Sequence, residues 1–178
     1  VIDWANECPD VVTGWNSQFF DIPYLVRRIN RVLGDSFAHK LSPWNLLRER
    51  KVLINNEEQL VYDITGVNTL DYIDLMKKYT YGGRESWKLD NVAYDEVGLR
   101  KLPYEGTFKD HYTKDWQHFT MYNICDVSLV KLMDDKMKLI DLALTIAYDS
   151  KIVPDEVFSQ FRSWDSLIYN ELKGKGIV

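Results

Sequence analysis

Two acidic signatures in this chain carry the residue types best suited to chemistry. Residues 14–24 read Gly-Trp-Asn-Ser-Gln-Phe-Phe-Asp-Ile-Pro-Tyr and contain Asp21, and residues 122–126 read Tyr-Asn-Ile-Cys-Asp and end at Asp126. Each carboxylate lies among aromatic and apolar residues, where a charge is costly to bury unless a partner compensates it. A divalent cation is one such partner, so the two signatures are candidates for a metal-dependent site.

The second signature lies inside the longest helical pattern of the sequence, about residues 116–148, in which we expect one break. One face of this pattern is apolar or aromatic at every position but one. The positions on this face are Phe119, Tyr122, Asp126, Val130, Met133, Met137, Ile140 and Leu144. An acid such as Asp126 in this stripe must shift its pKa, pair with a cation or bind a metal. Tyr122 precedes it by one turn, so both side chains approach the same small volume. A buried acid that is hydrogen-bonded for structural reasons is the alternative.

Asp21 lies where an expected strand, residues 11–15, meets an expected helix, residues 22–33, that Gly34 ends. An Asp that opens a helix is most often an N-cap. A strand-to-helix junction in an α/β domain is also a common place for a ligand, and Asn16 could reach the same cleft. Both interpretations of Asp21 stay open.

Other carboxylates give weaker signals. Asp71 and Asp74 form a close acidic pair, in which helix capping by Asp71 is favoured over a role in a site. Asp134 and Asp135 fall on the wetter side of the long helix and are set aside.

The histidines and cysteines do not indicate a metal centre. His39, His111 and His118 show no ligand-like clustering, although the last two are spaced to align on one helix, with His118 at the surface. Zinc is therefore not predicted. Cys8 and Cys125 lack metal-type spacing and have apolar neighbours, so we expect free, buried thiols of a reducing compartment.

Composition restricts the class of protein. The chain has 178 residues, 46% of them hydrophobic, which suffices for one well-packed domain with room for an appendage. No apolar run is long enough to cross a bilayer and no signal peptide opens the sequence, which predicts a soluble, intracellular protein. The net charge of −5 argues against a purely electrostatic nucleic-acid binder. It does not exclude an enzyme that holds a few nucleotides through metal ions.

The remaining pattern predicts an α/β protein. Residues 51–64 are expected to form a hairpin, with strands at 51–54 and 60–64 around a polar turn at 55–59. Further expected elements are a helix ending near residue 8, a strand at 67–72, short helices at 75–79 and 89–97, a mostly loop stretch at 100–112, and a helix at 163–172.

Several segments in this order resemble the 3′–5′ proofreading exonuclease domain of a family B DNA polymerase, most closely the T-even-like tailed-phage branch. The segments are residues 13–24, 70–75 and 122–127, followed by 157–159 and 163–165, which resemble the stretch that leaves the exonuclease. The resemblance implies a ribonuclease-H-like fold, truncated at its N-terminal side, with a mixed sheet flanked by helices and a β-hairpin insertion. It also implies a domain boundary, with a partial exonuclease at residues 1–148 and a connector at 149–178.

The resemblance further implies a two-metal exonuclease of the DEDDy type, with Mg²⁺ or Mn²⁺ as cofactor. Asp126 would be a direct metal ligand, Asp21 would hold the second ion, and Tyr122 would orient the nucleophile. Asn16 and Phe20 would line the cleft for the frayed 3′ end. The implied partners are the single-stranded 3′ end of DNA and the rest of a polymerase chain, in the cytoplasm of an infected bacterium.

One departure from the family pattern limits this interpretation. The first family motif, Asp-x-Glu on a strand before residues 14–24, occurs nowhere in the sequence. We therefore expect a truncated piece with little or no nuclease activity of its own. The alternatives are a non-catalytic binding or scaffolding domain of the same fold and a stand-alone RNA-trimming exonuclease, which residues 149–178 disfavour.

Overall fold

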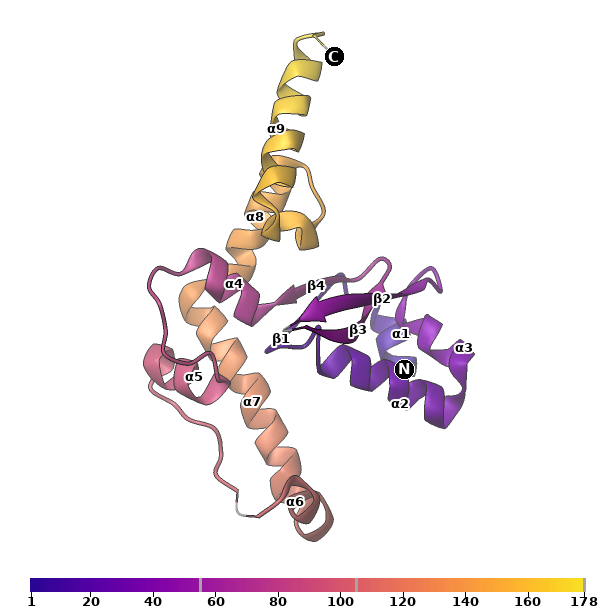
Figure 1. Cartoon of the computed structure of the whole chain (residues 1–178), viewed down its shortest axis with the longest axis vertical. Helices are drawn as coiled ribbons and strands as arrows, with labels where there is room; N and C mark the ends of the chain where they lie inside the picture. The colour runs from indigo at the N-terminus through magenta and orange to yellow at the C-terminus, as the bar shows by residue number, and fades with distance from the viewer. Residues whose placement is uncertain (55, 105, 178) are drawn as a thin grey trace.

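The computed structural model describes residues 1–54, 56–104 and 106–177, and they form a mixed α/β structure (Figure 1). The elements in chain order are α1 (Ile2–Glu7), β1 (Val11–Gly14), α2 (Asp21–Leu33), α3 (Asp35–Ala38), η1 (His39–Leu41), β2 (Leu47–Ile54), β3 (Glu57–Ile64), β4 (Asn68–Asp71), α4 (Tyr72–Tyr79), α5 (Leu89–Val97), α6 (Phe108–Lys114), α7 (Trp116–Met137), α8 (Leu139–Ser150), η2 (Pro154–Phe158) and α9 (Gln160–Gly174).

Strands β1 and β4 pair in parallel and separate two packed halves of the molecule (Figure 1). Successive side chains of a strand point to opposite faces. Val11 accordingly packs against the cluster built on α4, α5, α7 and α8, and Val12 packs against the cluster built on α2, α3 and β3. The Thr13 hydroxyl donates to the Leu70 carbonyl oxygen at 2.7 Å and ties the pair together. The ends of both strands therefore lie where the two halves meet.

Helix α2 follows the predicted apolar spacing. Ile22, Val26 and Ile29 are buried on one face of this helix. Gly34 ends it with φ of 99°, a conformation that other residues adopt only with strain. The predicted helix and its stop are confirmed, but Val32 and Leu33 of the last turn are exposed and do not join the buried face.

The long C-terminal helical pattern contains the expected break. Lys138, with φ of 54°, ends α7 and precedes α8. Val130 and Met133 are buried as the stripe predicted. Beyond the break the prediction holds only in part, because the left-handed residue rotates the next helix: Ile140 packs against the core, but Leu144 is 37% exposed, and Leu139, Ala143 and Ala147 form the buried face of α8.

The predicted hairpin exists, but its strands are longer than predicted. β2 and β3 pair antiparallel from Leu47↔Ile64 to Ile54↔Glu57, so residues 57–59 belong to a strand and not to the turn. Asn55, which was also placed in the turn, lies outside the described residues. Cross-strand ion pairs support the extension, including Lys51 Nζ to Glu58 Oε2 at 2.8 Å.

Four other sequence predictions need correction. Helix α4 starts at Tyr72 and not at residue 75, and α9 starts at Gln160, earlier than predicted. Residues 108–112 are helical and not loop, because Thr107 and Asp110 form a capping box that starts α6. Cys8 is exposed, although both cysteines are free as expected.

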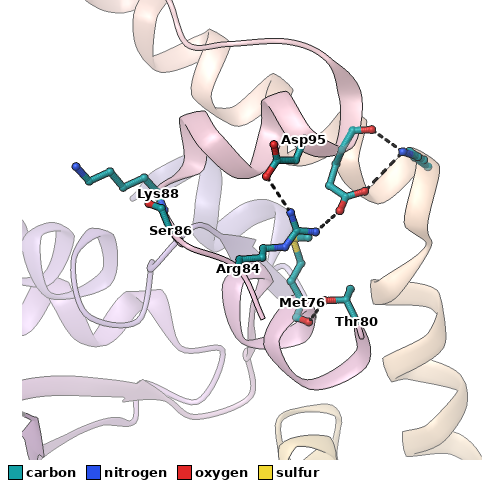
Figure 2. Close-up of polar contacts among 8 residues, drawn as sticks. Met76, Thr80, Arg84, Ser86, Lys88 and Asp95 are labelled. Carbon is teal, nitrogen blue, oxygen red and sulfur yellow. Dashed lines mark hydrogen bonds and ion pairs between the residues drawn. The ribbon is translucent and has the colours of Figure 1, made fainter. Parts of the chain in front are cut away.

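A group of ion pairs links α5 to the loop before it and to α7. Arg84 Nη1 lies 3.4 Å from Asp95 Oδ2, and its other amino group pairs with Glu96 (Figure 2). Lys136 of α7 donates to the Glu96 backbone oxygen at 2.5 Å. These contacts fix the end of α5, from which the chain continues to the loop that carries Lys101. Within the described ranges, no helix is both long and apolar enough to cross a membrane.

Candidate functional site

A buried carboxylate shapes the turn that carries the first signature. Asp71 is 2% exposed, and its Oδ1 accepts hydrogen bonds from the backbone N–H of Asn16 at 2.9 Å and of Ile73 at 3.2 Å. Its Oδ2 accepts from the Gln18 N–H at 3.2 Å and from the Ser17 hydroxyl at 3.3 Å. The bond to Ile73 caps α4, which confirms the predicted capping role. The other three bonds hold the turn between β1 and α2.

The local sequence fits this tight turn. Asn16 adopts φ of 62°, a left-handed conformation that Asn tolerates better than most residues. A Cβ atom added to Gly14 would lie 2.9 Å from Cβ of Ser17, so only glycine fits there without displacement. The turn therefore brings the chain directly from the end of β1 to Asp21.

Asp21 is exposed and is the first residue of α2. The N-cap position belongs to Phe20, and no side chain caps the helix there, so the predicted N-cap role of Asp21 is wrong. Partial burial raises the pKa of the Asp21 carboxyl above its ordinary value, and the nearby Asp71 carboxylate raises it further. Asp21 thus remains available to a cation, and a neighbouring cation would relieve this repulsion.

Asp126 has a different environment in the middle of α7. Its Oδ2 lies 2.7 Å from Nζ of Lys101, and its side chain is 25% exposed. Its Oδ1 is buried and has no hydrogen-bond partner among the described residues. Burial works to lower the pKa of Lys101, but hydrogen bonds to Asp126 and Tyr122 outweigh it and the pKa is raised. Of the compensations that the sequence left open, the structure shows pairing with a cation.

Lys101 is a residue of the candidate site that sequence analysis missed. It lies in the loop after α5, and its Nζ is 4.7 Å from the centre of the Tyr122 ring, so it contacts both residues of the second signature. Nothing in the spacing of the sequence signals this contact, because a loop lysine carries no periodicity. Only the path of the chain from α5 brings the ammonium group to α7.

Tyr122 lies one turn before Asp126, as predicted, and is 7% exposed. Its ring meets Tyr104 edge-on at 5.4 Å between centroids, and Phe108 edge-on at 6.1 Å. The phenol is therefore held in a packed aromatic environment on one side, with the ammonium of Lys101 close to its ring.

The two predicted acids have separate partners. Asp21 belongs to the half of the molecule built on α2 and has Asp71 as its acidic neighbour. Asp126 belongs to α7 and is paired with Lys101. Asn16 is exposed and gives its backbone N–H to Asp71, and Phe20 is 67% exposed, so its ring is accessible for stacking.

The residues present do not fit a two-metal centre. Within residues 1–54, 56–104 and 106–177 there is no group of three or more His, Cys, Asp or Glu side chains placed to hold a metal ion. The unpaired Oδ1 of Asp126 offers a single coordinating oxygen. A hard divalent ion such as Mg²⁺ needs several oxygen ligands, so one carboxylate beside a lysine does not make a site.

A separate open cleft of about 1380 Å³ lies between the hairpin and the η2–α9 segment. Asp71 and Asp74 border it, together with Arg48, Asp155 and Arg162. Tyr122 and Asp126 are not among its lining residues. The cleft has mixed charge and is distinct from the surroundings of the second signature.

Comparison with known proteins identifies the family. The family described as DNA polymerase family B, exonuclease domain, matches residues 3–92, which is half of the chain. The chain therefore belongs to this family, and the resemblance inferred from its signatures is confirmed. Asp21 and Asp71 lie within the matched range.

Two phage proteins are similar to nearly the whole chain. The DNA-directed DNA polymerase of Escherichia phage RB69 is 36% identical over 175 residues, 98% of this chain, and that of Enterobacteria phage T4 is 34% identical over 172 residues, 97% of it. The chain spans 19% of the length of each of these curated relatives.

Proposed function

We propose that this chain contributes the 3′–5′ proofreading exonuclease of a DNA-directed DNA polymerase, on a ribonuclease-H-like fold. The observation that carries the proposal is the position of a buried tyrosine, Tyr122, one helical turn before Asp126, whose Oδ1 has no hydrogen-bond partner among the described residues. The family match and the two phage polymerases support the same conclusion. The mixed α/β structure, with a parallel strand pair and a hairpin insertion, is consistent with that fold.

We assign roles to the signature residues on this basis. Asp126 and Asp21 are two of the acids that would ligate Mg²⁺ or Mn²⁺ in a complete DEDDy centre, and Tyr122 would orient the attacking water. Asn16 and Phe20 would hold the frayed 3′ end, with stacking on the exposed Phe20 ring. Because the four-acid centre is incomplete within these residues, we expect the isolated chain to have little or no nuclease activity.

The domain boundary and partners are part of the same proposal. Residues 1–148 would be the partial exonuclease and residues 149–178 a connector to the rest of a polymerase chain. Helix α9 has no buried residue, which suits a segment that packs against something else. The substrate would be the single-stranded 3′ end of DNA, in the cytoplasm of an infected bacterium.

A transplant experiment tests the function. These 178 residues would replace the corresponding segment of the phage RB69 polymerase, and hydrolysis of a mispaired, labelled 3′ end would be followed with Mg²⁺. We expect the chimera to remove the mispaired nucleotide, and Asp126→Asn in it to lower the rate at least ~100-fold, because a metal ligand is lost. Asp135→Asn, at an exposed position of the same helix, is the matched control and should leave the rate unchanged. A chimera that polymerises but never hydrolyses the 3′ end would contradict the proposal.

A second candidate is a non-catalytic nucleic-acid-binding or scaffolding domain of the same fold. The ion pair of Lys101 with Asp126 favours it, because the ammonium group already neutralises the acid that a metal would need. This candidate predicts a chimera that retains polymerisation and DNA binding with no 3′ hydrolysis.

A further inference from the structure

The corner between α6 and α7 packs against the ring of Tyr122. His111 of α6 is 6% exposed and stacks on Tyr104, with 5.0 Å between ring centroids and 8° between planes. The same imidazole meets the Tyr122 ring edge-on at 6.0 Å. His111 and Tyr104 therefore form one wall against which the phenol ring of Tyr122 rests.

A second histidine holds this wall in place. Nε2 of His111 lies 2.5 Å from Nδ1 of His118, which is on α7, one turn before Tyr122. The spacing of the two histidines would allow them to align on one helix, and His118 was expected at the surface. Instead they lie on different helices and touch, and His118 is half-buried. Asp115 lies between the two helices and its side chain caps α7, so the histidine contact joins α6 to the first turn of α7.

The buried second nitrogen of His111 decides which tautomer makes the contact. Nδ1 of His111 has no hydrogen-bond partner among the described residues. If Nε2 accepted the hydrogen bond from His118, the only N–H of a neutral His111 would be on Nδ1, as a buried donor without an acceptor. Such donors are rarer and costlier than unpaired acceptors. The favoured arrangement has Nε2–H of His111 donating to Nδ1 of His118, which leaves only a lone pair unpaired.

We propose that His111, as the Nε2–H tautomer, is a positioning residue for Tyr122. The hydrogen bond to His118 fixes α6 against α7, and the position of α6 then sets the angle of the phenol ring through the contacts of Phe108 and Tyr104 with it. The two nearest carboxylates have other partners than the His111 ring. Asp110 pairs with Lys114, and Asp115 accepts a hydrogen bond from the His118 backbone N–H. The inference rests on the proposed role of Tyr122, but its geometry concerns the corner alone.

Two amide variants separate the hydrogen bond from the loss of the ring. His111→Gln places a donor near the position of Nε2, whereas His111→Asn places the same amide near Nδ1, where it cannot reach His118. Both variants lose the stack on Tyr104 equally. His39→Gln, at an exposed histidine, is the control for a change of histidine to amide.

The readout is NMR of the intact chain with ¹⁵N-labelled histidine and ring-labelled tyrosine. In the unchanged protein at neutral pH we expect the His111 nitrogen shifts of the Nε2–H tautomer. His111→Gln should keep the Tyr122 ring signals near their original positions, and His111→Asn should shift and broaden them. His39→Gln should leave them unchanged.

Two results would overturn the proposal: an Nδ1–H tautomer at His111, or Tyr122 signals that His111→Asn leaves in place in a folded protein. If His111→Asn does not fold, the tautomer of His111 measured in the unchanged protein still tests the proposal. None of these measurements depends on nuclease activity. Failure of the proposed exonuclease function, seen in the chimera, is therefore distinguishable from failure of this inference.

Discussion

Asp71 and Asp126 are both acids in largely apolar surroundings, yet their environments differ in kind. Asp71 is 2% exposed and receives four hydrogen bonds, two at each carboxylate oxygen. Asp126 is 25% exposed, pairs one oxygen with Lys101, and leaves the other without a partner among the described residues. The Asp71 carboxylate is saturated, meaning that both oxygens are hydrogen-bonded within the fold. The Asp126 carboxylate has one oxygen that could still accept a ligand. The difference in burial agrees with this contrast, but the hydrogen-bond donors at each carboxylate oxygen decide it.

The largest expected effect on the free energy of unfolding comes from replacing Asp71, the carboxylate with four hydrogen bonds. Asp71→Ala should lower the free energy of unfolding by about 3 kcal/mol, because it removes the α4 cap and leaves buried N–H groups unpaired. Urea denaturation measures the change. Asp74→Ala, at the half-buried neighbour, is the control and should cost much less. A loss below ~1 kcal/mol for Asp71→Ala would mean that solvent replaces the four donors.

For the Asp126 pair we expect a smaller loss in the free energy of unfolding, which a second substitution restores. Lys101→Met should destabilise the protein by about 1–3 kcal/mol, because it leaves the Asp126 charge partly buried and unpaired. Combining it with Asp126→Asn should recover most of this loss. A double-mutant cycle from urea denaturation gives the coupling energy. A coupling near zero would show that the pair is screened by solvent and would remove the contrast with Asp71.

The smallest effect concerns the repulsion between Asp21 and Asp71. Because the pKa of Asp21 is raised in the folded state, folding favours its protonated form, and ionisation destabilises the fold as pH rises through that pKa. Asp21→Asn should therefore stabilise the protein at pH 7. The gain should be under about 0.5 kcal/mol because the group is exposed and screened.

The pH dependence provides the check on Asp21→Asn. The gain should disappear below the ordinary Asp pKa of 3.8, where the carboxyl is protonated in both the folded and the unfolded chain. Thermal unfolding at pH 7 and pH 3 measures both limits. A gain that persists at pH 3 would assign the effect to helix propensity and not to charge.

Local patterns predicted the elements that surround these acids. The apolar spacing of α2, the helix Leu89–Val97 and the break within residues 116–148 all follow from periodicity and turn chemistry. The errors had two origins, a local capping signal that the loop prediction overlooked and the pairing of a strand with its neighbour. Thr107 and Asp110 start a helix in a predicted loop, and cross-strand pairing extends the hairpin.

The amino-acid sequence by itself determined which residues could do chemistry and which helix carries Tyr122 and Asp126, because helical spacing depends only on near neighbours. The tertiary structure decided which acid is saturated and which is not. Three of the four donors to Asp71 come from a turn 53 to 55 positions earlier, and the cation beside Asp126 comes from a loop before α6. Partners so distant are set by how β1, α5 and α7 pack, which no local pattern records.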